Sequence, residues 1–142
     1  IKEALPQIKT VIHKFDEAAL YDDDKSLFSN YSHKKSKALR ADIVVNGGER
    51  LAPGAQELEI IHTPGHTRGG ICIVCENRLF TGDTLFHREI GRCDLGDGDY
   101  QAIQRSIKKL YELPGDYFVY PGHEAATTLD EERKLNPYVR QE

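Results

Sequence analysis

Apolar residues along the chain recur in short runs separated by turn residues, a pattern typical of β-strands. Six runs predict strands, at residues 9–13, 41–45, 58–61, 71–75, 78–80 and 117–120. The runs at 71–75 and 78–80 are joined at Glu76-Asn77, which predicts a tight hairpin. No period is sustained between residues 21 and 40, so we expect a long surface loop there.

Two segments have the signals of helices. Asp99 is placed to cap the first, which Pro114-Gly115 stops, and its apolar side chains recur at the spacing of one helix face, at Ile103, Ile107, Leu110 and Tyr111. Thr128 and Glu131 have the spacing of a capping box for a last helix, which ends before Asn136-Pro137. Because strands and helices alternate along the chain, the sequence predicts an α/β or α+β fold.

The length and charge of the chain narrow its class. At 142 residues it has the size of one domain, so we expect a single domain over residues 1–142 with a working core. Lys and Arg number 19 against 23 Asp and Glu, and the resulting charge of −4 argues against a dedicated nucleic-acid or anionic-membrane surface. No apolar run approaches the ~20 residues that span a bilayer. We therefore expect neither a nucleic-acid nor a membrane partner.

The cysteines indicate the compartment. Cys72, Cys75 and Cys93 are odd in number, which fits a reducing compartment better than a disulfide framework, so we expect a cytoplasmic protein. Cys72 and Cys75 have CxxC spacing but lie in an apolar strand-like run, where side chains three apart point to opposite faces. The pattern favours buried strand cysteines over a zinc knuckle.

Three metal-capable side chains each follow a glycine near the end of a strand: His66, Asp83 and His123. Strand ends hold side chains rigidly, and small flanking residues let loops crowd together at one rim. Imidazole and carboxylate together suit Zn²⁺ or Fe²⁺. Each histidine alone is more often structural, but their coincidence predicts a metal site. His13 lacks a partner at metal spacing, so packing is favoured for it, and His62 is expected to hydrogen-bond its loop.

The motifs around these side chains resemble those of the metallo-β-lactamase superfamily, and within it those of the short glyoxalase II-like hydrolases. The resemblance continues through Glu131-Glu132 and Asn136-Pro137, and the motifs that carry it are His62-Thr63-Pro64-Gly65-His66-Thr67, Phe80-Thr81-Gly82-Asp83-Thr84-Leu85-Phe86, Gly91-Arg92-Cys93-Asp94 and Tyr120-Pro121-Gly122-His123. It implies an αββα sandwich with the metal site at one edge.

The resemblance also implies a role for each ligand. His66 would complete the ligands of a first metal, Asp83 would bridge two metals and take part in catalysis, and His123 would bind the second. Two zinc ions are expected in the complete domain, with iron or manganese as alternatives. A hydroxide held by the two ions would attack the carbonyl of a small-molecule thioester, ester or lactone.

One motif of the family, HxHxDH, is not found in these 142 residues. It supplies two ligands to one metal and an Asp and a His to the other. We expect it to lie upstream, so that residues 1–142 form the C-terminal two-thirds of an N-terminally incomplete fold; a metal-free natural relative is the less favoured account. Three ligands shared by two metals are few, so this chain alone should bind metal weakly and hydrolyse thioesters poorly. Exposed apolar sheet surface would favour self-association.

Substrate recognition stays open. The resemblance implies that Arg92 is the basic residue that binds the glutathione part of a substrate, but the two tyrosine positions hold Asp94 and Ala125. Arg92 is equally well a structural salt-bridge partner. Cys93 would lie near the metals, where a small loop residue is favoured over a reactive thiol.

Three other functions compete with the hydrolase. A persulfide dioxygenase shares the motifs of His66, Asp83 and Arg92 but uses one iron; Gly122-His123-Glu124 favours the hydrolase over it. A superfamily nuclease is disfavoured by the charge of −4. A non-catalytic fragment or interaction module is supported by the missing HxHxDH motif itself.

Overall fold

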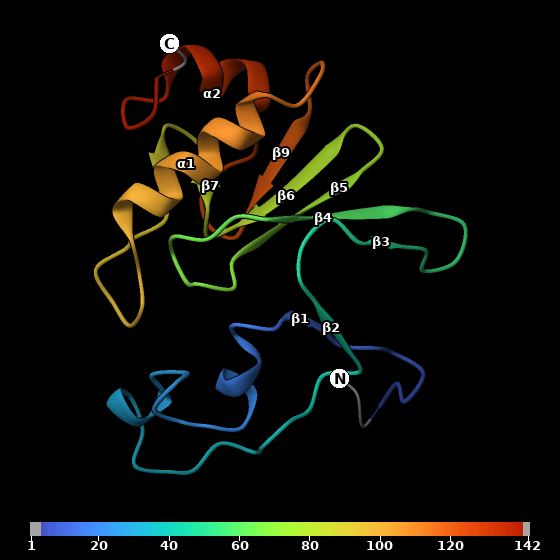
Figure 1. Cartoon of the computed structure of the whole chain (residues 1–142), viewed down its shortest axis with the longest axis vertical. Helices are drawn as coiled ribbons and strands as arrows, with labels where there is room; N and C mark the ends of the chain where they lie inside the picture. The colour runs from blue at the N-terminus through green and yellow to red at the C-terminus, as the bar shows by residue number, and fades with distance from the viewer. Residues whose placement is uncertain (1–3, 141–142) are drawn as a thin grey trace. The chain divides into compact units, whose positions relative to one another are not determined.

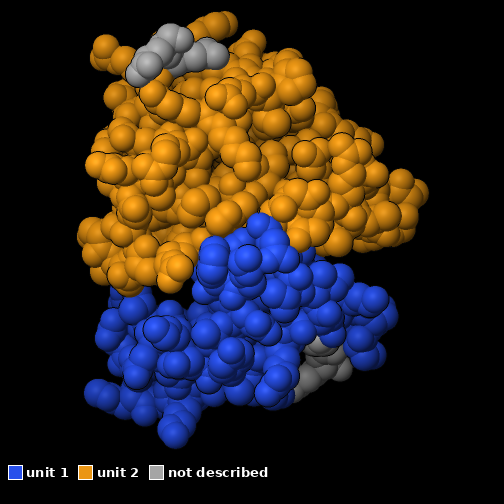
Figure 2. Space-filling model, viewed as in Figure 1, with its two compact units in different colours: residues 1–46 blue, residues 47–142 orange. Residues whose placement is uncertain are grey.

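The structure of the protein is a computed structural model in which residues 4–140 are described (Figure 1). The chain divides into two compact units, residues 1–46 and residues 47–142 (Figure 2). This division into units does not test the expectation of one domain over residues 1–142, which stays a prediction. Among the described residues, no helix is long and apolar enough to cross a membrane.

The smaller unit contains a two-stranded parallel sheet, in which β1 (Val11–His13) pairs with β2 (Ile43–Val45). Both strands lie inside runs that the sequence predicts. The segment between them has the short 3₁₀ helices Glu17–Leu20 and Phe28–Asn30, the second of which interrupts the expected loop. His13 is buried; its Nδ1 accepts from the Phe15 amide and its Nε2 lies 3.1 Å from the Asn46 carbonyl. These bonds confirm the packing role expected for His13.

The larger unit is built on a six-stranded sheet in the order β10-β9-β6-β5-β4-β3 (Figure 1). Its strands are β3 (Arg50–Leu51), β4 (Leu58–His62), β5 (Ile71–Cys75), β6 (Arg78–Gly82), β9 (Phe118–Pro121) and β10 (Thr127–Thr128). Four of these confirm the runs predicted at 58–61, 71–75, 78–80 and 117–120. A separate hairpin, β7 (Leu85–Phe86) with β8 (Glu89–Ile90), lies where the sequence shows only an irregular segment.

Helix α1 (Tyr100–Tyr111) lies against one face of this sheet (Figure 1) and confirms the first predicted helix. The Asp99 carboxylate accepts a hydrogen bond from the Ala102 amide at 2.9 Å, which confirms the expected cap. The apolar face of the helix is buried together with Leu79 and Val119 of the sheet. Burying each large aliphatic side chain contributes roughly 1.5–3 kcal/mol, so this contact carries much of the stability of the unit.

The other face of the sheet exposes aromatic side chains. Phe80 and Tyr120 stack with ring centroids 5.5 Å apart, and about two-fifths of each side chain is exposed (42% and 40%). They alternate along their strands with the buried Leu79 and Val119, as expected for a sheet with one covered face. Self-association through this surface stays a prediction.

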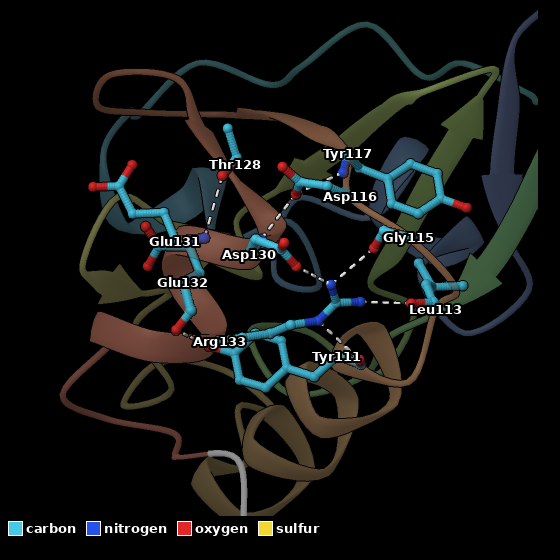
Figure 3. Close-up of polar contacts among 10 residues, drawn as sticks. All are labelled: Tyr111, Leu113, Gly115, Asp116, Tyr117, Thr128, Asp130, Glu131, Glu132 and Arg133. Carbon is cyan, nitrogen blue, oxygen red and sulfur yellow. Dashed lines mark hydrogen bonds and ion pairs between the residues drawn. The ribbon is translucent and has the colours of Figure 1, made fainter.

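The side chain of Arg133 joins the last helix, α2 (Leu129–Leu135), to the end of α1 (Figure 3). Arg133 donates from Nε to the Tyr111 carbonyl at 3.0 Å and from Nη1 to the Gly115 carbonyl at 2.8 Å, and its Nη2 donates to Leu113. The Tyr111 carbonyl belongs to the last residue of α1 and the other two follow it, where helix hydrogen bonding ends and a positive charge is favoured. Thr128 accepts from the Glu131 amide at 3.2 Å, which confirms the predicted helix start.

Candidate metal centre

The sheet topology brings the ends of three strands to one edge. Strands β4 and β6 are both antiparallel to β5, and β9 is parallel to β6. All three therefore run in the same direction, and their carboxyl ends meet at one edge of the sheet. His66 lies in the loop after β4, Asp83 directly follows β6, and His123 comes two residues after β9. The common direction of the strands explains why residues so distant in sequence come together.

The loop that presents His66 is pressed against the start of α1. Gly65 has a φ of +149°, and a Cβ at this position would lie 2.3 Å from the Cβ of Ile103. The Ser106 hydroxyl donates to the Pro64 carbonyl at 2.7 Å, and the Asp99 amide donates to the Gly65 carbonyl at 2.8 Å. Only glycine fits this approach, so Gly65 lets the helix fix the loop.

Asp83 is directed by an irregularity in β6. The pairing of β6 with β9 shifts register between Phe80 and Gly82, and Gly82 has a left-handed φ of +50°. Bulges of this kind redirect the side chain that follows. A Cβ on Gly122 would lie 2.6 Å from Asp83 Oδ1, and one on Gly91 would lie 1.8 Å from the Asp83 carbonyl oxygen. Two glycines from other segments therefore make room for Asp83.

The Asp83 carboxylate contacts both histidines. Its Oδ2 lies 3.4 Å from His66 Nε2, and its Oδ1 lies 3.5 Å from His123 Nε2. About a third of the His66 and Asp83 side chains is exposed, against 72% of His123. Phe86 packs edge-on against the His123 ring at a centroid distance of 6.0 Å. The structure thus brings together the three residues that the sequence selects as metal ligands.

The protonation of His66 can be deduced from its contacts. Its Nδ1 lies 2.8 Å from the Arg92 carbonyl oxygen, which can only accept a hydrogen bond, so Nδ1 carries a proton. In the neutral ring, Nε2 then directs a lone pair at Asp83 Oδ2. Both atoms of this pair can therefore offer a lone pair to a metal ion. A backbone carbonyl that orients the second ring nitrogen is typical of histidine ligands.

The donor separations also fit a metal. Two ligands bound at ~2.1 Å to one tetrahedral zinc stand ~3.4 Å apart, close to the observed contacts of 3.4 and 3.5 Å. Over residues 4–140, however, no group of three or more His, Cys, Asp and Glu side chains forms a site that could hold a metal ion. The structure shows two ligand pairs that share Asp83, and the role of these residues as metal ligands stays a prediction.

Arg92 contributes differently through its backbone and its side chain. Its carbonyl orients His66, while its guanidinium makes a two-bond ion pair with Asp94, at 2.8 Å from Nε to Oδ1 and 2.9 Å from Nη2 to Oδ2. These bonds lower the pKa of Asp94 to about 2. The structure thus shows the salt bridge considered for Arg92, and its binding of substrate stays a prediction.

The other histidine and the cysteines near the site have structural contacts. His62 Nε2 lies 2.8 Å from the Arg68 carbonyl, as expected for a residue that holds its loop. Cys93 donates to the Gly91 carbonyl, and burial, followed by the charges of Asp99 and Asp94, raises its thiol pKa. This supports a small loop residue over a reactive thiol. Cys72 and Cys75 are both buried in β5, which confirms the expectation for the CxxC pair.

Several residues that position the site are not visible as motifs. Ser106 lies on the buried face of α1, where a lone serine gives no functional signal. The Arg92 carbonyl belongs to the backbone and has no sequence signature. Gly91 and Gly122 stand in motifs, yet their steric role depends on which segments the fold brings beside Asp83.

The larger unit has a mixed sheet with a helix against one face, and two imidazoles and a carboxylate at one edge, which makes it an α/β protein. The family model described as the metallo-beta-lactamase superfamily matches residues 3–123. The chain belongs to the metallo-β-lactamase superfamily, whose members are metal-dependent hydrolases or related enzymes.

Three known proteins illustrate the relationship. The chain is 40% identical over 95 residues to hydroxyacylglutathione hydrolase GloC of Haemophilus influenzae, with 65% of this chain and 45% of that protein covered. It is 36% identical over 105 residues to human mitochondrial persulfide dioxygenase ETHE1, with 69% and 41% covered. The crystal structure of the BLEG-1 B3 metallo-beta-lactamase matches with a TM-score of 0.89 and 30% identity, over 97% of this chain and 68% of that one.

These comparisons confirm the predicted metallo-β-lactamase fold, an α/β sandwich. The chain spans about half the length of the curated relatives that it matches.

Proposed function

We propose that the chain carries part of the active site of a metal-dependent hydrolase of the glyoxalase II-like type. The observation that supports this most is the position of Asp83, whose two carboxylate oxygens each contact one histidine, His66 or His123. A carboxylate between two imidazoles suits a bridging ligand of two divalent cations.

His66 and His123 would each hold one metal through Nε2, and Asp83 would contact both. The Arg92 carbonyl keeps the proton of His66 on Nδ1, so its Nε2 is available as a ligand. When bound, divalent metals lower the pKa of water and polarise a carbonyl oxygen. Zinc is the metal that we propose, with iron or manganese as alternatives that the same donors accept.

The proposed substrate is a small-molecule thioester or a related ester. The name of the Haemophilus influenzae relative, hydroxyacylglutathione hydrolase, supports this class. Asp94 occupies two donors of Arg92, so a carboxylate on the substrate would have to share or displace that ion pair. An ion pair this exposed is screened by water and contributes little to stability, which makes the displacement feasible.

The test is turnover of a glutathione thioester by the zinc-loaded chain and by its Asp83→Asn variant. Asn has the same shape but no charge to hold two cations. We expect slow zinc-dependent turnover by the chain, and at least a 100-fold lower rate in the variant. Glu112→Gln, a charge change in the same unit directly after α1, is the matched control and should leave the rate unchanged. Turnover that persists without metal, or in Asp83→Asn, would exclude the proposal.

A persulfide dioxygenase is the second candidate, supported by the 36% identity to the human enzyme of that name. The two candidates differ in metal and in co-substrate. Iron content together with oxygen uptake on glutathione persulfide would favour the dioxygenase, whereas zinc with thioester turnover and no oxygen uptake favours the hydrolase.

A further inference from the structure

Four buried side chains with polar groups lie between the loop that presents His66 and the turn that presents Asp83: Thr63, Cys72, Thr81 and Thr84. Thr63 is three residues before His66, and Thr84 directly follows Asp83. All four come from β4, β5 and β6 or from the residues that follow them. Burying a polar group costs free energy unless the group is hydrogen-bonded, so these side chains need partners beside the two loops.

Their contacts form one connected chain of hydrogen bonds. Cys72 Sγ donates to the Thr81 carbonyl at 3.7 Å, and burial raises the pKa of this thiol to about 11, so its proton is retained. Thr63 Oγ1 lies 3.3 Å from Cys72 Sγ, within hydrogen-bond distance of the sulfur. Thr84 Oγ1 lies 3.3 Å from Thr63 Oγ1, and the Thr84 hydroxyl also hydrogen-bonds Cys72.

These hydrogen bonds therefore connect Thr84 and Thr63, through Cys72, to the Thr81 backbone. The Thr81 hydroxyl completes the arrangement by donating to the Leu85 carbonyl at 2.7 Å, which holds the residues after Asp83. Hydrogen bonds have preferred lengths and angles, so this chain restricts the separation of the two loops more narrowly than apolar packing would.

We propose that Thr63 and Thr84 are positioning residues of the metal site: their contact sets the distance between the loops of His66 and Asp83. The inference rests on the proposed function, because a fixed separation matters only if the two side chains share a ligand. Neither hydroxyl touches a ligand atom, so both act through the backbone of their loops.

The first test is zinc affinity in hydroxyl-deleted variants of the full chain. Thr63→Val and Thr84→Val keep the side-chain shape and remove one donor each. We expect zinc affinity to fall about 10-fold in either variant, at the lower end of the effect of outer partners of metal ligands. Thr63→Ser and Thr84→Ser keep the hydroxyl and should restore affinity to within about twofold.

The matched control is Tyr111→Phe. It also deletes a buried hydroxyl, which donates to the Glu132 carbonyl at 3.1 Å on α2, away from the three ligands. Its stability should fall by as much as that of the valine variants, while its zinc affinity stays at the wild-type value. If the valine variants and Tyr111→Phe lose stability alike and all keep wild-type zinc affinity, the proposal is overturned.

A second test needs no metal. In Thr84→Val, the Gly65 amide, which donates to Thr67, should exchange its hydrogen about fivefold faster. In Thr63→Val, the Thr84 amide, which donates to Thr81, should do the same. The Leu129 amide serves as the remote reference.

Each substitution is thus read out on the opposite loop. If the wild-type chain bound no zinc, the proposed function would fail. Unchanged hydrogen-exchange rates of the Gly65 and Thr84 amides in these variants would separately refute the positioning role.

Discussion

Replacing Gly122 by Ala perturbs the Asp83 carboxylate without changing a ligand. A Cβ at this position would lie 2.6 Å from Asp83 Oδ1 and 3.2 Å from the carbonyl carbon and oxygen of Gly82. Ordinary van der Waals contact begins at 3.4 Å, so the carboxylate oxygen must withdraw by about 0.8 Å. The contact with His123 is made by the same oxygen, so it is the first to be lost.

The clash with the Asp83 carboxylate costs little stability because that group is the far end of a side chain that can rotate, while the Gly82 backbone must shift by a few tenths of an ångström. A rotation of about 30° away from a rotamer costs roughly 0.5–1.5 kcal/mol. The cost in metal binding is larger, since ligand atoms must be held to a few tenths of an ångström. We expect zinc affinity to fall at least 10-fold, which is about 1.4 kcal/mol.

The assay is a zinc titration against a chromophoric chelator, with thermal unfolding in parallel. Gly115→Ala is the matched control: Gly115 has a φ of +81° and open space around its Cβ position, away from the three ligands. It should lower stability by about 1 kcal/mol and leave zinc affinity unchanged. Zinc affinity of Gly122→Ala within twofold of the wild type would refute the view that this turn limits the position of Asp83.

Three further predictions concern other features. Arg133→Lys loses the fork that binds carbonyls after α1, so unfolding free energy should fall by about 3 kcal/mol, measured by urea denaturation. The Asp94 pKa is depressed to about 2, chiefly by its hydrogen bonds to Arg92, so the Arg92–Asp94 pair is fully formed above the ordinary carboxyl value of 3.8 and is lost as pH falls through 2. Carboxyl ¹³C titration should show this, and Arg92→Gln should raise the Asp94 pKa toward 3.8. The raised Cys72 pKa favours folding most below the ordinary thiol value of 9.0, and this contribution is lost as pH rises through about 11; iodoacetamide at pH 8 should therefore modify Cys72 only after unfolding.

Most of the larger unit could be predicted from local pattern. The runs 71–75 and 78–80 are apolar and bounded by turn residues, and they form the antiparallel pair β5–β6. The spacing of Ile103 and Ile107 predicts α1 correctly because one face of that helix is buried against the sheet. Strands β7, β8 and β10 have two residues each, too few to produce a period, and depend on pairing with neighbouring segments.

The candidate site was predictable where it depends on strand ends and not where it depends on contacts between loops. His66 and Asp83 each follow a glycine after a strand, a local signal that holds whatever the fold. The contact of Thr63 with Thr84 arises only because β4 and β6 run in the same direction on either side of β5. Threonines are common near strand ends, so the sequence around Thr63 does not indicate that it contacts Thr84, 21 residues further on.

The central claim is that His66, Asp83 and His123 bind metal together. Its most direct test is the NMR spectrum of the histidine ring nitrogens as zinc is added. We predict that the Nε2 signals of His66 and His123 shift together, while those of His13 and His62, whose Nε2 atoms face the Asn46 and Arg68 carbonyls, stay in place. Unchanged His66 and His123 signals, or equal shifts of all four histidines, would contradict the claim.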